Sequence, residues 1–335
     1  MGAAVAGSVI GCASAAFAGS DNSSDTYAGD VNGIALPAGT FLAIEYLGWR
    51  DSNTYVTTGN NIFTKTGVSG GKKDVDGNLD LFTSITRFSY FTRLWDHPLV
   101  LEAAFTVAKV EGDANVGPEP LTSADGLTDP VLFISYGLIN APKEERFLAL
   151  TNYVYLPGGR SYQKFEGINV TTPNQTTWVP QVAYAEGLGK FGLQNLWLDI
   201  IANASIHSDG GAPLAVETIF GPAQFDNLSQ DNSYDIKAFL RYEFGQATHV
   251  AVGIEKSWGG DQIASGGGLG LAFGPTSLGK DDFLKGHLQI NFPLAADFHV
   301  DTDFTHDFER EGGFKEDFTG EVRFTKFFLP TAPLK

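Results

Sequence analysis

The chain has 335 residues, 43% of them hydrophobic, and a formal net charge of −17 at pH 7. Its 40 Gly, 26 Phe and 11 Tyr, beside one Met and one Cys, are typical of many short strands joined by tight turns. The acidic balance excludes nucleic acid as a partner, because nucleic-acid binding needs clustered Lys and Arg. No run of about 18 apolar residues occurs, which excludes a membrane helix, so a membrane-spanning form would have to be a closed barrel.

The first residues have the features of a secretory signal peptide. They are small and apolar and end in Ala16-Phe17-Ala18, which is an A-x-A cleavage site. We therefore expect residues 1–18 to be removed on secretion. In the alternative, Val9-Ile10-Gly11-Cys12 resembles a bacterial lipobox, and Cys12 would carry a lipid. After cleavage at Ala18 the mature chain has no Cys, which suits an oxidising compartment without disulfides.

Most of the remaining chain is a succession of strand-like segments. Residues 19–38 are polar and rich in Gly, and we expect them to form a flexible leader or a short plug in a lumen. Residues 39–328 hold the strands, and residues 329–335 form a short tail. We predict about twelve strands, at residues 40–49, 81–92, 99–110, 130–138, 146–156, 177–186, 191–206, 232–245, 248–258, 283–292, 298–308 and 318–328.

The connections between these segments alternate between short and long. The short ones include residues 93–98, 139–145 and 293–297, whereas residues 50–78, 111–129, 207–231 and 259–282 are long and polar. This alternation is typical of outer-membrane barrels, which have tight periplasmic turns and long extracellular loops. The connection at residues 309–317 is the exception, because a long loop is expected there and the segment is short.

Residues 232–245 are the clearest strand, because alternate residues have opposite chemistry. The alternation persists over about twelve residues, longer than the five or six of an ordinary strand, and suits a tilted membrane strand. The apolar row also begins and ends in aromatic residues, as rows between two aromatic girdles do. The two rows are Tyr234, Ile236, Ala238, Leu240, Tyr242 and Phe244, and Ser233, Asp235, Lys237, Phe239, Arg241 and Glu243.

These patterns predict an all-β fold. We expect a transmembrane antiparallel up-and-down β-barrel of about twelve strands, with short periplasmic turns and long extracellular loops, in the outer membrane of a Gram-negative bacterium. The apolar rows would face lipid and the polar rows the lumen, and the acidity would belong to the loops or to a cation-tolerant lumen. In the alternative of a soluble all-β protein, the acidity would only keep a secreted surface soluble.

Three short motifs resemble a known family. They are Leu36-Pro37-Ala38-Gly39-Thr40 before the first strand, Gly126-Leu127-Thr128-Asp129-Pro130, and Tyr153-Val154-Tyr155-Leu156-Pro157-Gly158-Gly159-Arg160. In this order they resemble the outer-membrane family named for the meta-pathway of phenol degradation, whose members are described as transporters. The resemblance implies an outer-membrane barrel that passes aromatic or other hydrophobic compounds. It implies no catalytic residue.

The candidate functional residues are those expected on the lumen wall. In residues 298–309 one row is mainly apolar, and the other holds His299, Asp301, Asp303, Thr305, Asp307 and Glu309. We expect the charges of residues 232–245 to form ion pairs with this acidic row or with Glu255. Phe239 would either contact an aromatic solute or simply fill the lumen. The lumen-facing candidates are Asp235, Lys237, Phe239, Arg241, Glu243, Glu255, His299, Asp301, Asp303 and Asp307.

Other chemistry has weaker support in the sequence. His299 and Asp301 lie about 6 to 7 Å apart along one strand, so a cation site would need ligands from adjacent strands. His207-Ser208-Asp209 invites comparison with outer-membrane lipid hydrolases, but adjacent residues of a strand point to opposite faces. The run Gly266-Gly267-Gly268-Leu269-Gly270 lacks the Lys of a phosphate loop. We expect no catalytic residue, metal or cofactor.

The sequence therefore predicts an outer-membrane channel for the passive uptake of small hydrophobic or aromatic solutes. The expected partners are such a solute, outer-membrane lipid, and the barrel assembly machinery. That machinery recognises an aromatic residue at the end of the last strand, here Phe328, which seven residues follow. The alternative from another class is a structural or adhesive barrel with a closed lumen.

Overall fold

A computed structural model describes residues 26–57, 73–114, 124–158, 175–210, 214–218, 221–225, 227–245, 248–267, 275–280 and 282–330. Several segments discussed above lie outside these residues. They are the expected signal peptide, the lipobox with Cys12, Gly268-Leu269-Gly270 of the glycine run, and residues 331–335.

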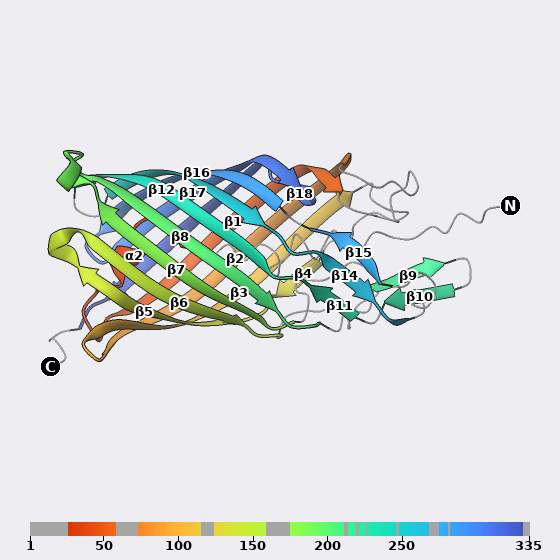
Figure 1. The fold of residues 1–335 in the computed structure, drawn as a ribbon, viewed down its shortest axis with the longest axis horizontal. Coiled ribbons are helices and arrows are strands. Elements are labelled where there is room, and N and C mark those ends of the chain that lie inside the picture. The colour runs from red at the N-terminus through yellow and green to blue at the C-terminus, as the bar shows by residue number, and fades with distance from the viewer. Residues whose placement is uncertain are drawn as a thin grey trace.

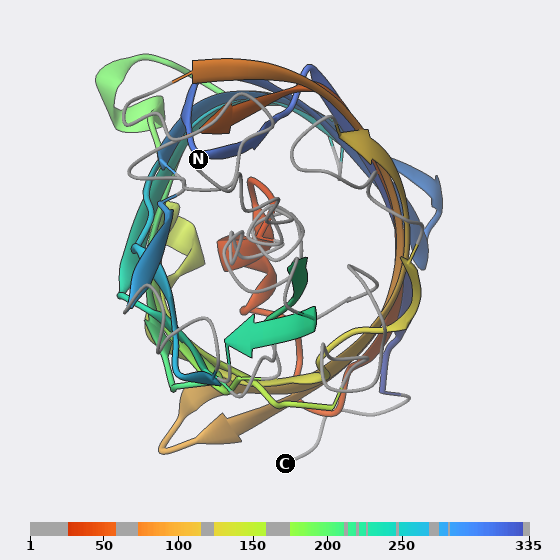
Figure 2. The same cartoon turned by 90° about the vertical axis from the view of Figure 1, so that its right-hand side faces the viewer.

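The described chain forms a closed antiparallel β-barrel, as predicted (Figures 1 and 2). Each strand pairs with the next along the chain, and β1 pairs with both β2 and β19, so that Phe41 lies opposite Tyr90 on one side and Phe328 on the other. Closure satisfies the backbone hydrogen bonds of both edges. The twelve wall strands are β1 (Phe41–Thr57), β2 (Lys73–Leu94), β3 (His97–Ala114), β5 (Val131–Ala141), β6 (Arg146–Tyr155), β7 (Thr177–Gly187), β8 (Leu196–His207), β12 (Ser233–Gly245), β13 (Thr248–Trp258), β16 (Asp282–Ala295), β17 (Phe298–Glu311) and β19 (Phe318–Phe328).

The alternation of side chains fixes which face of each strand points outward. In β12, Lys237 and Arg241 are buried, whereas Tyr234 and Leu240 are 53% and 47% exposed. The outer surface is an apolar belt with aromatic residues toward both ends, as lipid contact requires. Those toward the loops include Trp49, Phe82, Trp178, Tyr234, Trp258 and Phe318, and those toward the turns include Phe41, Phe88, Tyr90, Tyr242, Phe244, Phe292 and Phe328.

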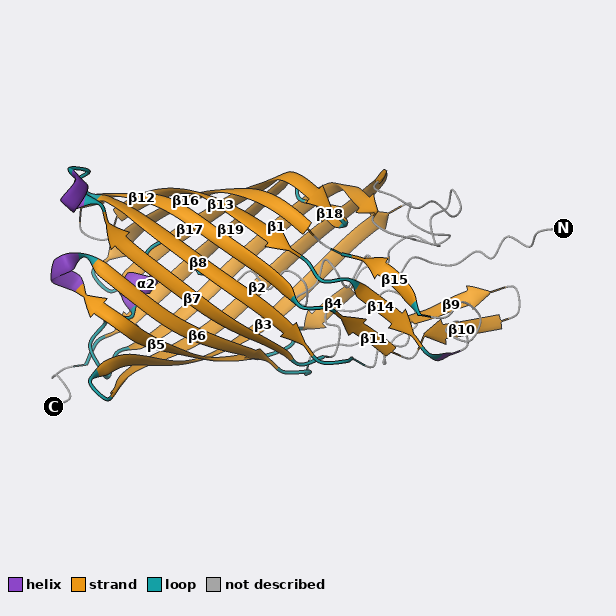
Figure 3. Ribbon diagram, viewed as in Figure 1, coloured by secondary structure: helices purple, strands orange, loops and turns teal. Residues whose placement is uncertain are grey.

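The two ends of the barrel differ. At one end the connections are tight turns or single turns of 3-10 helix, η1 (Pro142–Glu144) and η3 (Gly189–Phe191). At the other end, short strands extend from the wall: β4 (Ala124–Leu127) pairs with β3, β18 (Gly313–Lys315) pairs with β1, β9 (Leu214–Thr218) pairs with β10 (Gly221–Phe225), and β14 (Gln262–Ser265) lies between β11 (Asn227–Gln230) and β15 (Thr276–Gly279) (Figure 3). The end with the short turns is the periplasmic end of such barrels.

Three details correct the expectations from sequence. β1 continues to Thr57 and β2 begins at Lys73, so much of the expected loop at residues 50–78 consists of paired strands. β8 begins at Leu196 rather than at residue 191, because Gly192 and Asn195 have positive φ angles that end the preceding turn. Glu309 is exposed on the outer face, because an irregularity in pairing between β16 and β17 shifts the alternation after Asp307.

The three motifs have structural roles at turns. In the first motif, Thr40 N donates to Pro37 O at 3.1 Å, so residues 37–40 form a turn. Gly39, the third residue of this turn, has a φ of 89°, which favours glycine there. The other two motifs meet, because Gly158 N donates to Asp129 Oδ1 at 2.9 Å. They therefore fix the start of β5 beside the end of β6, where Val131 lies opposite Tyr155.

Phe239 points inward and covers a glycine on the neighbouring strand. Its ring lies where a Cβ on Gly253 would be, 2.2 Å from Phe239 Cδ1, and it makes an edge contact with His287 at 5.4 Å between centroids. Phe239 is 1% exposed. Of the two roles considered for it, this burial favours lumen filling over contact with a solute.

We predict that Gly253→Val destabilises the barrel by about 1–3 kcal/mol, because the new methyl groups displace the Phe239 ring. Urea unfolding in detergent micelles, followed by heat-modifiable gel mobility, measures this loss. In the double variant Gly253→Val/Phe239→Ala the two losses should not add, since each residue occupies the space of the other. Additive losses would contradict the packing described.

Candidate functional site in the barrel lumen

Residues 26–36 lie inside the barrel and include its innermost helix, α2 (Asp30–Gly33) (Figure 2). None of the helices in the described ranges is long and apolar enough to cross a membrane. Gly29 has a φ of 88°, and Asn32 N donates to its carbonyl at 3.0 Å. Tyr27, Ala28, Val31 and Ile34 are each no more than 5% exposed. They pack against inward apolar residues of the wall, among them Leu42, Phe91, Val100, Phe147 and Ala149.

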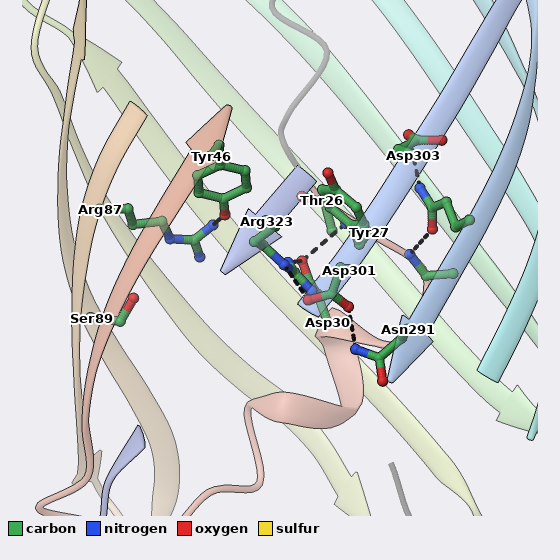
Figure 4. A network of polar contacts seen from close by, with 12 residues as sticks. Thr26, Tyr27, Asp30, Tyr46, Arg87, Ser89, Asn291, Asp301, Asp303 and Arg323 are labelled. Carbon is green, nitrogen blue, oxygen red and sulfur yellow. Dashed lines mark hydrogen bonds and ion pairs between the residues drawn. The ribbon is translucent and has the colours of Figure 1, made fainter. Parts of the chain in front are cut away.

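Arg323 of β19 joins this internal segment to the wall (Figure 4). Its Nη1 lies 2.8 Å from both carboxylate oxygens of Asp30, and its Nε lies 2.9 Å from Asp301 Oδ2. The guanidinium also lies over the ring of Tyr27, 4.2 Å from its centroid. One arginine therefore contacts two residues of the segment and one of β17, and Asn291 donates to the second oxygen of Asp301.

Further hydrogen bonds position the segment. The Tyr27 hydroxyl donates to Glu321 Oε1 at 2.6 Å, and Ala28 N donates to Gln289 Oε1 at 2.8 Å. Burial, and then the carboxylates of Glu321 and Asp303, raise the pKa of Tyr27 well above its ordinary value. Tyr27 is therefore a neutral hydrogen-bond donor at physiological pH.

Among the described residues, one cavity lies on each side of this segment in the lumen. The outer cavity, toward the loops, has a volume of about 230 Å³, and the inner cavity, toward the turns, has about 300 Å³. Thr26, Arg87 and Tyr153 line both. The segment therefore separates two spaces that are stacked along the barrel axis.

The wall of the outer cavity has an apolar half and a polar half. The apolar half comes from β2, β3, β5 and β6, and its centre is a stack of Phe133 on Tyr153 with 4.8 Å between ring centroids. Arg87 lies over the other face of this pair, 4.6 Å from the Phe133 centroid. The polar half comes mainly from β12 to β19 and includes Lys237, Glu255, Lys285, His287, Asp303, Thr305 and Glu321.

Charges in the cavities are almost balanced. Four Lys or Arg and five carboxylates line the outer cavity, and three Arg and four carboxylates line the inner one. The surplus of acid in a chain of net charge −17 therefore lies largely outside these two cavities. Of the two expectations for the acidity, this balance favours acidic loops over an acidic lumen.

Several residues singled out from sequence lie together in the outer cavity. Lys237 Nζ is 3.6 Å from Glu255 Oε1. His287 connects that pair to β17, because its Nε2 is 3.0 Å from Glu255 Oε2 and its Nδ1 is 3.0 Å from Asp303 Oδ2. Asp301 instead accepts a hydrogen bond from Arg323 and lines the inner cavity. The acidic row of β17 is therefore divided between the outer and inner cavities.

Of the remaining candidates, Arg241, Glu243 and His299 line the inner cavity, whereas Asp235 and Asp307 line neither cavity. Arg241 is buried against Asp199 of β8, with 2.9 Å from Nε to Oδ2, and also pairs with Glu243. Asp235 accepts a hydrogen bond of 2.7 Å from Asn203. His299 lies against Phe327 at the inner cavity, 4.9 Å between centroids, and Asp307 pairs with Arg310 at 2.8 Å. Phe239 lines neither cavity.

Sequence reasoning missed the two arginines that organise the lumen. Arg323 lies in the row Glu321, Arg323 and Thr325 of β19, and Arg87 lies in the inward row of β2. The Arg87 Nε donates to Glu102 Oε2 at 2.8 Å and its Nη1 to the Tyr46 hydroxyl at 2.9 Å. The same two-residue alternation that identified β12 could have found both.

The geometry around His207 does not form a hydrolase site. Its Nδ1 is 3.0 Å from Thr177 Oγ1, and Ser208 Oγ accepts a hydrogen bond of 3.0 Å from Thr176 N. The described residues therefore pair His207 and Ser208 with separate partners. No group of three or more His, Cys, Asp or Glu among the described residues could hold a metal ion.

Comparison with one solved structure shows the same fold. An outer membrane channel from Pseudomonas putida F1 has a TM-score of 0.73 at 20% identity, over 91% of this chain and 100% of that chain. The deltaS2 mutant of the TodX monoaromatic hydrocarbon channel has a TM-score of 0.44 at 10% identity, over 87% of this chain and 89% of that chain. No protein-family profile and no curated protein matches the chain, so the family resemblance stays a prediction.

The fold and its apolar belt are those of an outer-membrane β-barrel, and they place the chain in the outer membrane of a Gram-negative bacterium, as predicted.

We predict that Arg323→Met destabilises the barrel by about 3 kcal/mol, because it leaves Asp30 and Asp301 without their cation. The effect is at the low end of the usual range, since 26% of the Asp30 side chain is exposed. Lys326→Met on the same strand is the control, because Lys326 and Asp297 are 40% and 49% exposed, and this variant should change stability little. Urea unfolding in micelles compares the two. Equal losses would contradict the anchoring role of Arg323.

Tyr27 gives a pH dependence of a definite sign. Because folding raises its pKa above the ordinary value of 10.0, the contribution of Tyr27 to stability is constant well below that pH and is lost as the pH rises from there toward the folded-state pKa. In Tyr27→Phe this fall should be weaker. Unfolding midpoints measured at several pH values between neutrality and strong alkali test the difference, and parallel curves for the two proteins would contradict it.

Proposed function

We propose that the chain is an outer-membrane channel for the passive uptake of small hydrophobic or aromatic solutes. The observation that carries this proposal is the outer cavity, whose wall is aromatic and aliphatic on one side and polar on the other. A ring can lie along Phe133, Tyr153 and their apolar neighbours while a polar substituent faces the opposite strands. A volume of about 230 Å³ suits a solute smaller than a typical drug molecule.

The electrostatics favour uncharged solutes. The Lys237 ammonium has Glu255 nearby, the Lys285 ammonium lies 3.0 Å from Glu316, and the lining of each cavity is within one charge of neutrality. A solute ion would lose its hydration without meeting an opposite net charge. An uncharged aromatic solute pays no such cost, so selectivity comes from the shape and polarity of the wall.

In this proposal, residues 26–36 act as a plug, and the solute moves by diffusion. The segment lies between the two cavities, so transit from the outer to the inner one requires the plug to shift. Arg323, Glu321 and Gln289 are wall residues that hold it. The Pseudomonas putida protein with the same fold is described as an outer membrane channel, which is consistent with this proposal.

The alternative of a structural or adhesive barrel with a closed lumen also has an observation in its favour. The plug residues Tyr27, Ala28, Val31 and Ile34 are as buried as a protein core. If the plug never moves, the barrel conducts nothing and its extracellular strands β9 to β11 become the functional part. Conductance across a planar bilayer, together with solute uptake into proteoliposomes, separates the two functions.

We expect the refolded protein to admit small uncharged aromatic solutes into proteoliposomes, and Ala108→Trp to reduce that uptake at least several-fold. Ala108 lines the outer cavity and is buried, so an indole there fills the space that the solute needs. Ala238→Trp on β12 is the matched control, because Ala238 lies in the outward row with Leu240. Absence of uptake and of conductance in the unmodified protein would contradict the channel function.

A further inference from the structure

A carboxylate lies on the lipid-facing side of the wall. In β1 the buried inward residues are Leu42, Ile44 and Tyr46, so Glu45 points outward. Two hydroxyls from the outward row of β2 donate to it, Ser84 Oγ to Oε1 at 2.6 Å and Thr86 Oγ1 to Oε2 at 2.7 Å. We refer to Glu45, Ser84 and Thr86 as the outer triad.

The outer triad lies halfway across the apolar belt. Phe41, four residues toward the turns, packs with Phe88 and Phe328 at 6.0 and 5.8 Å between centroids. Trp49, four residues toward the loops, packs with Phe304 and Phe318 at 6.5 and 6.4 Å. With a rise of about 3.3 Å per residue, Glu45 lies roughly 13 Å along the strand from each aromatic girdle. Glu45 therefore lies near the middle of the hydrocarbon core.

A carboxylate at this depth is costly and needs a polar partner. Ionisable residues that face lipid destabilise a barrel, and their presence in a membrane segment indicates a function. Among the described residues no Lys or Arg forms an ion pair with Glu45, and its hydrogen-bond donors are the two hydroxyls. Two hydroxyl donors leave other lone pairs of the carboxylate exposed to the bilayer.

We propose that the outer triad is the centre of an interface between two copies of this chain within the membrane. The triad holds both acceptors and donors, so it is complementary to itself, as an interface with twofold symmetry requires. Both copies must have the same orientation in the membrane, so the axis runs along the membrane normal. With that axis between β1 and β2, each Glu45 faces the hydroxyl row of the other copy.

The surroundings of the triad suit close contact between two walls. Ala43 lies two residues from Glu45 in the outward row of β1, and Ala103 lies in the outward row of β3, beyond β2; both are small, and small side chains let membrane segments approach until polar groups meet. Phe88 lies between these two alanines and Phe105 lies beside Thr86, and both, 41% and 47% exposed, supply contact area. Acyl chains of lipid offer no hydrogen bond at this depth, whereas a second copy brings its own.

The experiment measures association in lipid nanodiscs or liposomes. In a background with Cys12→Ser, which removes the single Cys of the chain, Ala43→Cys should be joined into a covalent dimer by a short bismaleimide cross-linker. Ala238→Cys, an outward alanine on β12, is the matched control and should give several-fold less dimer. Glu45→Leu should abolish the cross-link at position 43, and Glu45→Gln, which keeps hydrogen-bonding atoms, should retain most of it.

Heat-modifiable gel mobility confirms that each variant is folded. Ala43→Trp is a second test that leaves the triad intact, and its bulk should separate the copies and reduce dimer mass in light scattering of detergent micelles. A protein that is monomeric in lipid, equal cross-linking at residues 43 and 238, or dimers that survive Glu45→Leu would each overturn the proposal. None of these results depends on whether the lumen conducts.

Discussion

Closure of the wall is the constraint on which the rest of this structure depends. A strand edge in lipid has no partner for its amides and carbonyls, so β1 must pair with β19 as well as with β2. Closure then sorts side chains by the two-residue alternation of each strand. Outward rows meet lipid and are apolar, and inward rows enclose a space in which polar groups must satisfy one another. The buried ion pairs of the lumen follow from that enclosure.

Within the lumen, charged side chains form ion pairs with residues of other strands instead of contacting bulk water. Arg241 with Asp199, Lys237 with Glu255, and Arg323 with Asp30 and Asp301 each combine residues from different segments. Such pairs restrict the wall more than they stabilise it, because desolvation offsets much of their attraction. They leave two cavities of nearly balanced charge, of which the outer one has an apolar side.

The architecture was accessible from sequence because it depends on periodicity. Alternation in residues 232–245 predicted both the strand and its inward row, and the alternation of long and short connections predicted the barrel. Contacts between distant segments were not accessible. Nothing near Asp30 indicates that it meets Arg323, about 290 residues away, since that contact depends on where the N-terminal segment folds. Glu309 was assigned to the wrong face because a bulge interrupts a strict period of two.

The link between the internal segment and the wall is short, and this limits how the segment can move. Only residues 37–40 separate Leu36 from the first residue of β1, and Gly39 N is fixed to Phe91 O at 2.7 Å. Even fully extended, four residues span about 14 Å. A displaced segment therefore stays close to its site, at an effective concentration on the order of millimolar or higher. If the segment acts as a plug, it would return to its site quickly, and each opening of the lumen would be brief.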